Sequence, residues 1–338
     1  MRLGVLDIGS NTVHLLLVDA FPGARPTAFA SYKQQLSLVR YLDPRGAVTD
    51  EGRQALLSFV DEAVDFARRH RAEDLLAFCT SALREALNGP DIIRQVEQLS
   101  GVKLQELTGE EESAMTFFAA RRWFGWGVRD LMVLDIGGGS FEVAIGRNEF
   151  PDLAVSMPLG AARLTKDFLP GDPPKEALVG RLREYIAGVI EEPLRQFADQ
   201  VEPDLVVATS KTFRTLARMS GAASEADGPF LVRTLTLKDV RKWAEKLVSL
   251  SFDERAHLDG VSPIRAPQLL AGAVAAEMVM EKLEVKEVRI CPWALREGLL
   301  MHRFDRLLRD HDVIDDEYAG VGDVDALKEN LHLVPPAR

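Results

Sequence analysis

The chain has 338 residues, of which 46% are hydrophobic and 28% are charged, and its net charge is −11 at pH 7. This composition is that of a globular protein, and the length favours two domains. The acidic balance argues against a general nucleic-acid-binding protein, whose footprint is a basic surface. No apolar run approaches the length of a membrane span and the first residues lack a signal-peptide pattern, so we expect a cytoplasmic protein without a membrane partner.

The chain opens with an apolar strand, a turn and a second apolar strand over residues 3–18 (LGVLDIGSNTVHLLLV). The same order returns over residues 131–146 (LMVLDIGGGSFEVAIG), and the aspartates that lead the turns, Asp7 and Asp135, lie 128 positions apart (135 − 7). In both copies the glycines precede a strand, whereas those of a dinucleotide-binding fingerprint open a helix. A single turn of this kind is typical of a tight hairpin. The duplicated pair favours a site for phosphate and metal.

A second pair of segments repeats with nearly the same offset. Residues 75–87 (LLAFCTSALREAL) and 205–217 (LVVATSKTFRTLA) each predict a strand that runs through Thr-Ser into a helix, with the threonines 129 positions apart (209 − 80). Amphipathic helix patterns at residues 55–70 and 177–197 separate the two motifs of each half. Two motifs in the same order at the same spacing indicate the duplication of one α/β unit.

The remaining segments have no such repeat. Residues 108–125 predict a helix that closes the first half, and residues 288–308 predict a strand followed by a long helix. Arg296, early in that helix, either faces a cleft between the halves or supports the local turn. The stretch at about 218–270 has no counterpart in the first half and is interpreted as a helical insertion. The polar tail from about residue 311 is expected to be loosely ordered.

The two Asp-led turns supply most of the candidate phosphate ligands. Glycine has no side chain, so a phosphate can approach the backbone closely, and serine and asparagine add side-chain donors. Two further candidates, Ser81 and Lys211, lie at the starts of the helices that follow Thr-Ser, where anions are attracted. The candidates in the turns are Gly9, Ser10, Asn11, Gly137, Gly138, Gly139 and Ser140.

Carboxylates in or beside the same turns are candidate metal ligands. Asp7, Asp135 and Glu142 provide the hard oxygen atoms that Mg²⁺ prefers, and Mg²⁺ needs only one or two of them beside water and substrate phosphate. The sequence therefore predicts Mg²⁺, with Mn²⁺ as the alternative. Neither HExxH nor CxxC occurs, so no zinc site is predicted.

Two charged residues are candidates for catalysis. Glu112 lies in an acidic helix start in which Thr108 and Glu111 fit a capping box, which leaves Glu112 without a structural explanation of its own. From spacing alone, a general base and a helix-start carboxylate are equally well supported at Glu112. Arg84 shares a helix face with Ser81, where it either contacts a phosphoryl oxygen or is solvated.

These motifs resemble those of the exopolyphosphatase / guanosine pentaphosphate phosphatase family, within the actin-like superfamily. The TSKTFR and CPWALREG segments, together with the chain length, look most like those of the short two-domain actinobacterial exopolyphosphatases. The matching stretches run in the family's order from about residue 3 to 300 and are DIGSNTVHLLLV, CTSALREALN, GEEES, DIGGGSFEV, SMPLGAARLT, VATSKTFR, VSPIRAPQLLAGAV and CPWALREGLL.

The resemblance implies an α/β protein of two duplicated RNase H-like (actin-like ATPase) domains with an interdomain active-site cleft. The first domain would comprise residues 1–124 plus about 299–314, because the C-terminal helix of the family crosses back to it. The second would comprise residues 125–298 with the helical insertion, and residues 315–338 would form a C-terminal tail. Family members commonly dimerise, which implies a homodimer.

The resemblance also implies roles for individual residues. It assigns phosphate binding to the two turns, the catalytic carboxylate to Glu112, a cleft arginine to Arg84 and a metal-associated glutamate to Glu142. The implied reaction is a Mg²⁺-dependent, in-line attack of water that releases terminal orthophosphate from inorganic polyphosphate.

The sequence is compatible with other substrates and activities, and it departs from the family pattern in two places. Guanosine pentaphosphate, or another nucleoside polyphosphate, is the rival substrate. An ATP-dependent kinase and a non-enzymatic actin-like nucleotide switch are rivals on the same fold. Lys211-Thr212 replaces the Gly-Thr pair of many members and adds a cation to that loop. Longer members carry an additional helical domain that extends the polyphosphate channel, so short chains are the expected substrate.

Overall fold

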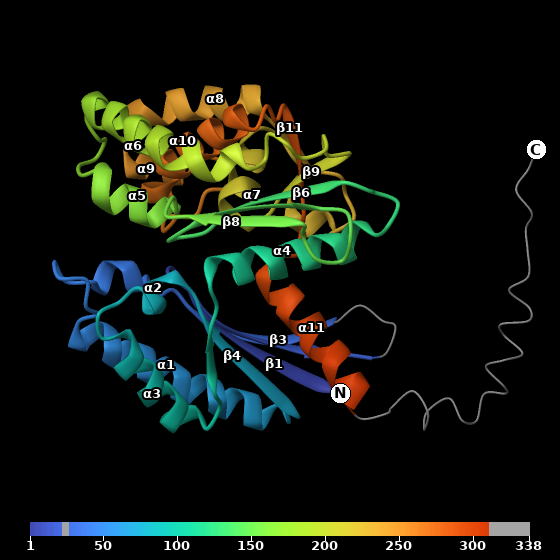
Figure 1. The fold of residues 1–338 in the computed structure, drawn as a ribbon. Coiled ribbons are helices and arrows are strands. Elements are labelled where there is room, and N and C mark those ends of the chain that lie inside the picture. Colours follow the sequence, from blue (N-terminus) through green and yellow to red (C-terminus); the bar gives the residue numbers. More distant parts are fainter. Residues whose placement is uncertain (22–26, 311–338) are drawn as a thin grey trace, which may run out of the picture.

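Two sheets organise the computed structural model, which describes residues 1–21 and 27–310 (Figure 1). Within these ranges the first sheet has five strands in the order β3-β2-β1-β4-β5, and the second has six in the order β10-β11-β9-β6-β7-β8. The central strands β1 and β6 each pair antiparallel with the strand that follows and parallel with a later one. Strands β3-β2-β1-β4-β5 of the first sheet thus correspond to β8-β7-β6-β9-β11 of the second, where β10 is an additional edge strand. This correspondence confirms the predicted duplication of one α/β unit.

The first sheet belongs to the first half of the chain, residues 1–124. Its strands are β1 (Arg2–Ile8), β2 (Val13–Asp19), β3 (Thr27–Gln34), β4 (Asp74–Cys79) and β5 (Leu104–Glu106). Its helices are η1 (Leu38–Tyr41), α1 (Asp50–Arg69), α2 (Ser81–Arg84), α3 (Gly89–Ser100) and α4 (Gly109–Phe124).

The second sheet belongs to the second half, from residue 125 onward. Its strands are β6 (Leu131–Ile136), β7 (Phe141–Gly146), β8 (Leu153–Met157), β9 (Leu205–Ala208), β10 (Thr234–Thr236) and β11 (Glu287–Ile290). Its helices are α5 (Ala161–Phe168), α6 (Glu176–Arg195), α7 (Ser210–Met219), η2 (Glu225–Asp227), α8 (Leu237–Lys246), η3 (Leu247–Ser249), α9 (Phe252–Ala256), η4 (Ala266–Gln268) and α10 (Leu269–Lys282). The last helix, α11, spans Leu295–Asp310.

Each sheet is covered on both faces, because its central strands are apolar on both sides. Helices α1 and α3 share one core with the first sheet, and α11 shares the core on its other face. Helix α4 packs against β6, β7 and β8 of the second sheet and also against α11. In Figure 1, α4 lies between the two sheets. Residues on α4 are therefore placed where the two halves meet.

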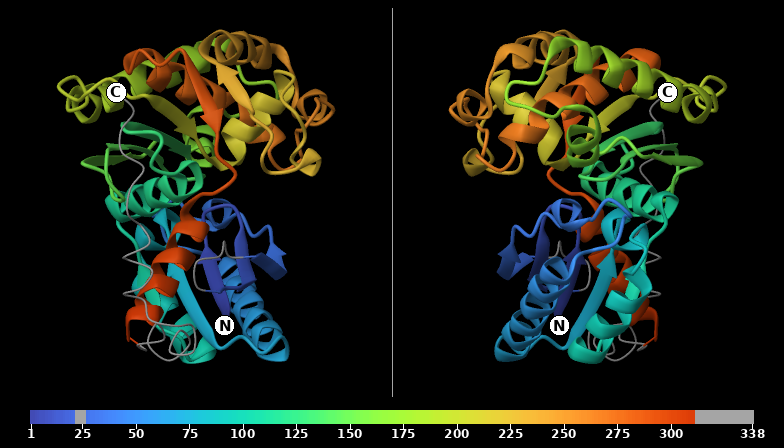
Figure 2. Two further views of the ribbon diagram at one scale, coloured as in Figure 1. Left: turned by 90° about the vertical axis from the view of Figure 1, so that its right-hand side faces the viewer. Right: turned by 90° about the vertical axis from the view of Figure 1, so that its left-hand side faces the viewer.

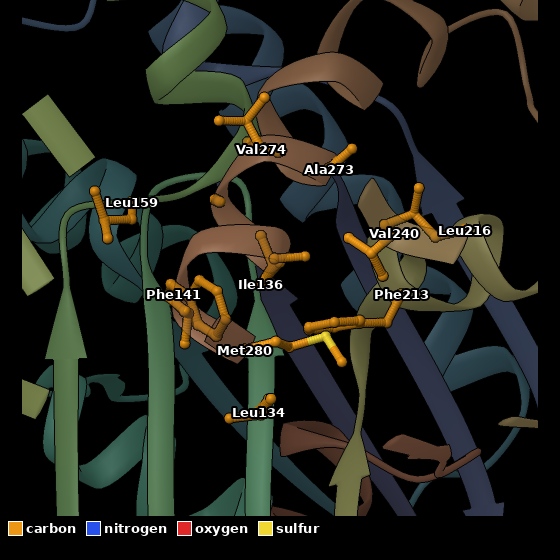
Figure 3. Close-up of a cluster of buried hydrophobic side chains, with 14 of the residues drawn as sticks. Leu134, Ile136, Phe141, Leu159, Phe213, Leu216, Val240, Ala273, Val274 and Met280 are labelled. Carbon is orange, nitrogen blue, oxygen red and sulfur yellow. The ribbon is translucent and has the colours of Figure 1, made fainter. Parts of the chain in front are cut away.

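The other face of the second sheet carries the largest core of the described residues. Figure 3 shows Phe141 and Phe213 beside Ile136 and Met280, all of which are buried. Helix α10, with the apolar sequence LLAGAVAAEMVM, is buried along most of its length. Its apolar residues belong to this core.

Helix α11 returns the chain to the first half. It follows β11 of the second sheet directly and then packs against α4 and β1 (Figure 2). The returning helix begins at Leu295, slightly before the expected residue 299. The expected tail at residues 315–338 lies outside the described residues. No helix in the described ranges combines the length and the hydropathy needed to cross a membrane.

The short strands differ from the sequence interpretation. Strand β10 lies inside the stretch at 218–270 that was interpreted as helical, and it pairs with β11 at the edge of the second sheet. Strands β3, β5 and β8 lie at sheet edges and were also not predicted. Edge strands lack the continuous apolar pattern of central strands, so the sequence carries little local signal for them.

Candidate active site

Two equivalent turns follow β1 and β6. In the first, the amide of Gly9 donates to the carbonyl of Thr12 at 3.2 Å; in the second, the amide of Gly137 donates to the carbonyl of Ser140 at 2.9 Å. The duplication therefore extends to the backbone hydrogen bond that closes each turn.

The two turns are in direct contact where the halves meet. A Cβ atom on Gly138 would lie 2.7 Å from Nδ2 of Asn11, and a Cβ atom on Gly139 would overlap Oγ of Ser81. Ser81 Oγ is also 3.0 Å from Ser10 Oγ, within hydrogen-bond distance. Glycine is required in the second turn because the first half approaches it so closely. The structure thus brings predicted phosphate-binding residues of both halves to one point.

The start of α5 supports the glycine-rich turn. The amides of Ala161 and Ala162 donate to the carbonyls of Gly137 and Gly138 at 3.0 Å. Arg163 adds a bond from Nε to the carbonyl of Gly139 at 2.8 Å. The carbonyl groups of the turn are thereby held by the protein, an arrangement suited to presenting neighbouring amide groups to an anion.

Polar side chains also join the halves across this point. Asn11 and Gln268 exchange two amide hydrogen bonds, of 3.0 and 3.1 Å, although they are 257 positions apart. Arg163 of α5 forms an ion pair with Glu85, which follows α2. These contacts fix the distance between the first turn and the helices of the second half.

Buried Glu112 and half-buried Arg84 form a pair beside the turns. Glu112 is 7% exposed, and its Oε1 accepts a hydrogen bond of 2.7 Å from Nη1 of Arg84. Arg84 also donates to the carbonyl of Leu107. The predicted capping box is present, because Thr108 and Glu111 bond reciprocally at the start of α4. The box occupies Glu111 and leaves Glu112 facing the arginine.

Burial controls the protonation of Glu112. It raises the pKa of this carboxyl to about 7, although the hydrogen bond and charge of Arg84 lower it. The negative charges of Asp7 and Asp135 raise this pKa further, so both aspartates are electrostatic neighbours of Glu112. A carboxylate with a pKa near neutrality is suited to accept a proton from water.

Of the three candidate metal ligands, Glu142 is buried, whereas Asp7 and Asp135 are half-buried. Asp135 and Glu142 are cross-strand partners on β6 and β7, and Glu142 Oε1 accepts a 2.8 Å hydrogen bond from Ser156. Burial raises the pKa of Asp7 and of Asp135 to about 6. It also holds the pKa of Glu142 well above its usual value, and the charges of Glu112 and Asp135 add to this. Such a concentration of largely desolvated acidic groups favours a bound cation.

A single Mg²⁺ ion fits part of this set. The Oδ1 atom of Asp135 is buried and has no hydrogen-bond partner, which is the environment of an oxygen that is available to a cation. Among the described residues, no three His, Cys, Asp or Glu side chains converge on one metal-binding point. The residues therefore fit a cation held by one or two carboxylates plus water and substrate phosphate, the usual arrangement for Mg²⁺.

Lys211 lies at a separate, basic cavity near the turns. The cavity has a volume of about 420 Å³ and is lined by Gln35 of the first half and by Lys211, Arg214 and Arg265 of the second, among others. The pKa of Lys211 is lowered by desolvation and by the positive charges of Arg265, Lys33 and Arg214. Nε of Arg214 is buried without a hydrogen-bond partner. The cavity is thus electropositive within an acidic protein.

Several site residues were missed from the sequence. Ser156, Arg163 and Gln268 contact the candidate residues, but each belongs to a motif whose individual positions carried no local signal. Arg296, whose role was left open, makes an ion pair of 3.8 Å with Asp7. All four contacts join residues that are distant in sequence or lie on different strands, which a reading of local patterns does not reveal.

Comparisons with known proteins agree with this architecture. The model of the Ppx/GppA phosphatase family matches residues 17–307. Exopolyphosphatase 1 of Mycobacterium tuberculosis is 48% identical over 305 residues, which cover 90% of this chain and 89% of that protein. Exopolyphosphatase 1 of Mycobacterium leprae is 46% identical, with 90% of both chains covered.

Solved structures have the same fold. The crystal structure of an exopolyphosphatase from Cytophaga hutchinsonii matches with a TM-score of 0.80 at 24% identity, covering 90% of this chain and 98% of that one. The Aquifex aeolicus member of the Ppx/GppA family matches with a TM-score of 0.74 at 24% identity, covering 92% and 99%.

Proposed function

This chain belongs to the Ppx/GppA phosphatase family, and we propose from this membership and from its site that it is an exopolyphosphatase. The enzyme releases terminal orthophosphate from inorganic polyphosphate. The observation that carries the assignment to this site is the hydrogen-bonded pair of Glu112 and Arg84 beside two equivalent turns that contact each other.

The reaction follows from what these residues can do. Glu112 accepts a proton from a water molecule while the oxygen of that water attacks the terminal phosphorus in line. The bridging P–O bond then breaks and the shortened polyphosphate leaves. Arg84 holds the Glu112 carboxylate and supplies positive charge where negative charge gathers on the phosphoryl oxygens. The turns hold the terminal phosphoryl group through backbone amides and through Ser10 and Asn11, so most of the acceleration comes from positioning.

Asp135 and Glu142 would hold Mg²⁺, and Asp7 lies on β1, next to the opposite turn, as a further acidic group. When bound, the ion would neutralise phosphate charge and favour departure of the leaving group. The unpartnered Oδ1 of Asp135 supports this assignment. Mn²⁺ is the alternative ion for the same oxygen ligands.

A nucleoside polyphosphate such as guanosine pentaphosphate is the second candidate substrate. The basic cavity at Lys211 and Arg265 favours it, because a volume of about 420 Å³ is within the range that accommodates a small organic ligand.

Orthophosphate release from polyphosphates of defined length, measured with and without Mg²⁺, tests the proposal. Wild-type protein is expected to release phosphate without an acceptor, which a kinase would require, and Glu112→Gln is expected to be inactive. Guanosine pentaphosphate assayed under the same conditions ranks the two substrates. Absence of release from every polyphosphate length would overturn the proposal.

Three further measurements test the remaining expectations. Comparison of chain lengths tests the proposed preference for short polyphosphates. Light scattering tests the proposed homodimer. Cell fractionation tests the proposed cytoplasmic location.

A further inference from the structure

Arg296 connects two residues that flank the first phosphate-binding turn. It lies in the first turn of α11, where its guanidinium bonds to Nδ1 of His14 and its Nε atom is 3.8 Å from Oδ2 of Asp7. A guanidinium group can only donate, so Nδ1 of His14 is the acceptor in this contact. One planar side chain thus contacts both neighbours at once.

The two contacted residues belong to the same hairpin. Asp7 on β1 and His14 on β2 are cross-strand partners, and the turn from Gly9 to Thr12 lies just beyond them. A group that bonds to both strands at this level holds the base of the turn. Among the described residues, Asp7 forms an ion pair with Arg296 and with no other side chain.

The position of Arg296 is itself fixed by its helix. The carboxylate of Glu297 accepts a 2.8 Å hydrogen bond from the amide of Ala294, which secures the first turn of α11. At Gly298 the backbone of α11 approaches the carbonyl of Met115 on α4 so closely that a Cβ atom would collide with it. Met115 lies one turn after Glu112 on α4, so this contact sets the distance between Arg296 and the helix that carries Glu112.

We propose that Arg296 is a positioning residue of the active site, which holds the Asp7 carboxylate and the first phosphate-binding turn in register with Glu112 across the α4–α11 contact. The inference rests on the function proposed above. The segment before α11 comes directly from β11 of the second sheet. Arg296 therefore lies close to the point where the chain crosses from the second half to the first phosphate-binding turn.

The alternative is that Arg296 only attaches α11 to the first sheet. Arg303 on the same helix offers the matched control, because it bonds Asp74 of β4 at 2.8 Å and is remote in sequence from the turns. A purely structural role predicts similar effects for Arg296→Gln and Arg303→Gln. A positioning role predicts a loss of turnover that is specific to Arg296.

The experiment measures kcat, KM and the unfolding midpoint of both variants and of wild type on polyphosphate with Mg²⁺. For Arg296→Gln we expect kcat to fall about 10- to 100-fold, the usual loss when a residue that orients a ligand is removed. We expect KM to change less than about threefold, because the distal phosphates are bound elsewhere. Arg303→Gln is expected to keep the kcat of wild type.

A kcat of Arg296→Gln within about twofold of wild type, or an equal loss in Arg303→Gln, overturns the inference. If Arg296→Gln does not fold, Arg296→Lys decides, because an ammonium group cannot replace the planar fork. Reduced kcat at unchanged KM in a folded Arg296→Lys variant supports the inference, and wild-type kcat overturns it. Wild-type protein that releases no phosphate would instead overturn the proposed function, and the inference with it.

Discussion

The guanidinium of Arg84 lies 2.7 Å from the carboxylate of Glu112, although the two residues are 28 positions apart and come from α2 and α4. Arg84 is anchored by the carbonyl of Leu107 and Glu112 by the capped start of α4. The pair is therefore rigid on both sides. A base held in this way needs no reorganisation before it takes a proton.

Replacing Glu112 with Gln is expected to abolish turnover while the protein stays folded. The amide keeps the size of the side chain and can still accept from Arg84, but it cannot take a proton, so we expect kcat to fall about 10²- to 10⁴-fold. Glu110→Gln, an exposed change in the same helical turn, is the control and should retain full activity. Phosphate release and an unfolding curve measure both. A Glu112→Gln variant with near-normal kcat would remove this residue from the mechanism.

The pH dependence should report Glu112. Burial raises its pKa to about 7, and the base must be deprotonated, so activity should increase as the pH rises through neutrality. With that pKa, the deprotonated fraction grows about tenfold between pH 6 and pH 8. Arg84 lowers the pKa of Glu112, so Arg84→Gln should move the ascending limb to higher pH. A limb that stays in place in this variant would contradict the assignment.

The turns and the helix start were predictable because their signals are local. An apolar strand that ends in Asp-x-Gly predicts a turn at the end of that strand. The repeat of this pattern predicted that Asp7 and Asp135 occupy equivalent positions. The capping box at Thr108 and Glu111 predicted where α4 begins. The structure has these elements where they were expected.

The contacts between the halves were not predictable, because no local pattern encodes them. Gln268 bonds Asn11 across 257 positions, and its own neighbourhood is an ordinary helix start. Arg296 had two equally supported interpretations until its helix was placed against β1. The edge strand β10 lacks the length and the apolar alternation that indicate a strand. Its residues were therefore assigned to the helical pattern that surrounds them.

Metal removal should stop the reaction, and Asp135→Asn should impair metal binding while the protein still folds. We expect chelation to reduce release by at least about 100-fold and added Mg²⁺ to restore it. Mg²⁺ should also raise the unfolding midpoint of wild type, since a ligand that binds only the folded state stabilises it. Asp135→Asn should lose this shift, whereas Asp167→Asn, an exposed change, should keep it. An unchanged midpoint shift in Asp135→Asn would exclude Asp135 as a ligand.

Lys211→Gln is expected to weaken substrate binding more than turnover. Lys211 lies at the basic cavity beyond the turns, where it would contact phosphates that do not react, so its loss should raise KM with little change in kcat. One charged contact corresponds to about a tenfold rise in KM. Lys242→Gln on α8 removes the same charge from an exposed position and should leave KM unchanged. A fall in kcat alone would place Lys211 at the reacting phosphoryl group instead.

Gly139→Ala tests whether the close contact of the two turns is needed for catalysis. The new Cβ atom would overlap Oγ of Ser81, so the turns must move apart or Ser81 must rotate away from Ser10. Extra volume at a packed contact typically costs about 1–3 kcal/mol. Misplacement of a reacting group by about 1 Å can reduce the rate about 100-fold. We therefore expect a folded, less stable protein whose kcat falls by about that factor.

The matched control is Gly180→Ala in α6, where a Cβ atom has no neighbour within 4 Å. Glycine destabilises a helix interior by about 1 kcal/mol relative to alanine, so this variant should be slightly more stable than wild type and equally active. The two substitutions add the same methyl group and should have opposite effects on the unfolding midpoint. If Gly139→Ala keeps wild-type kcat, the turns need not touch during the reaction, and phosphate binding between them would have to occur in a more open arrangement.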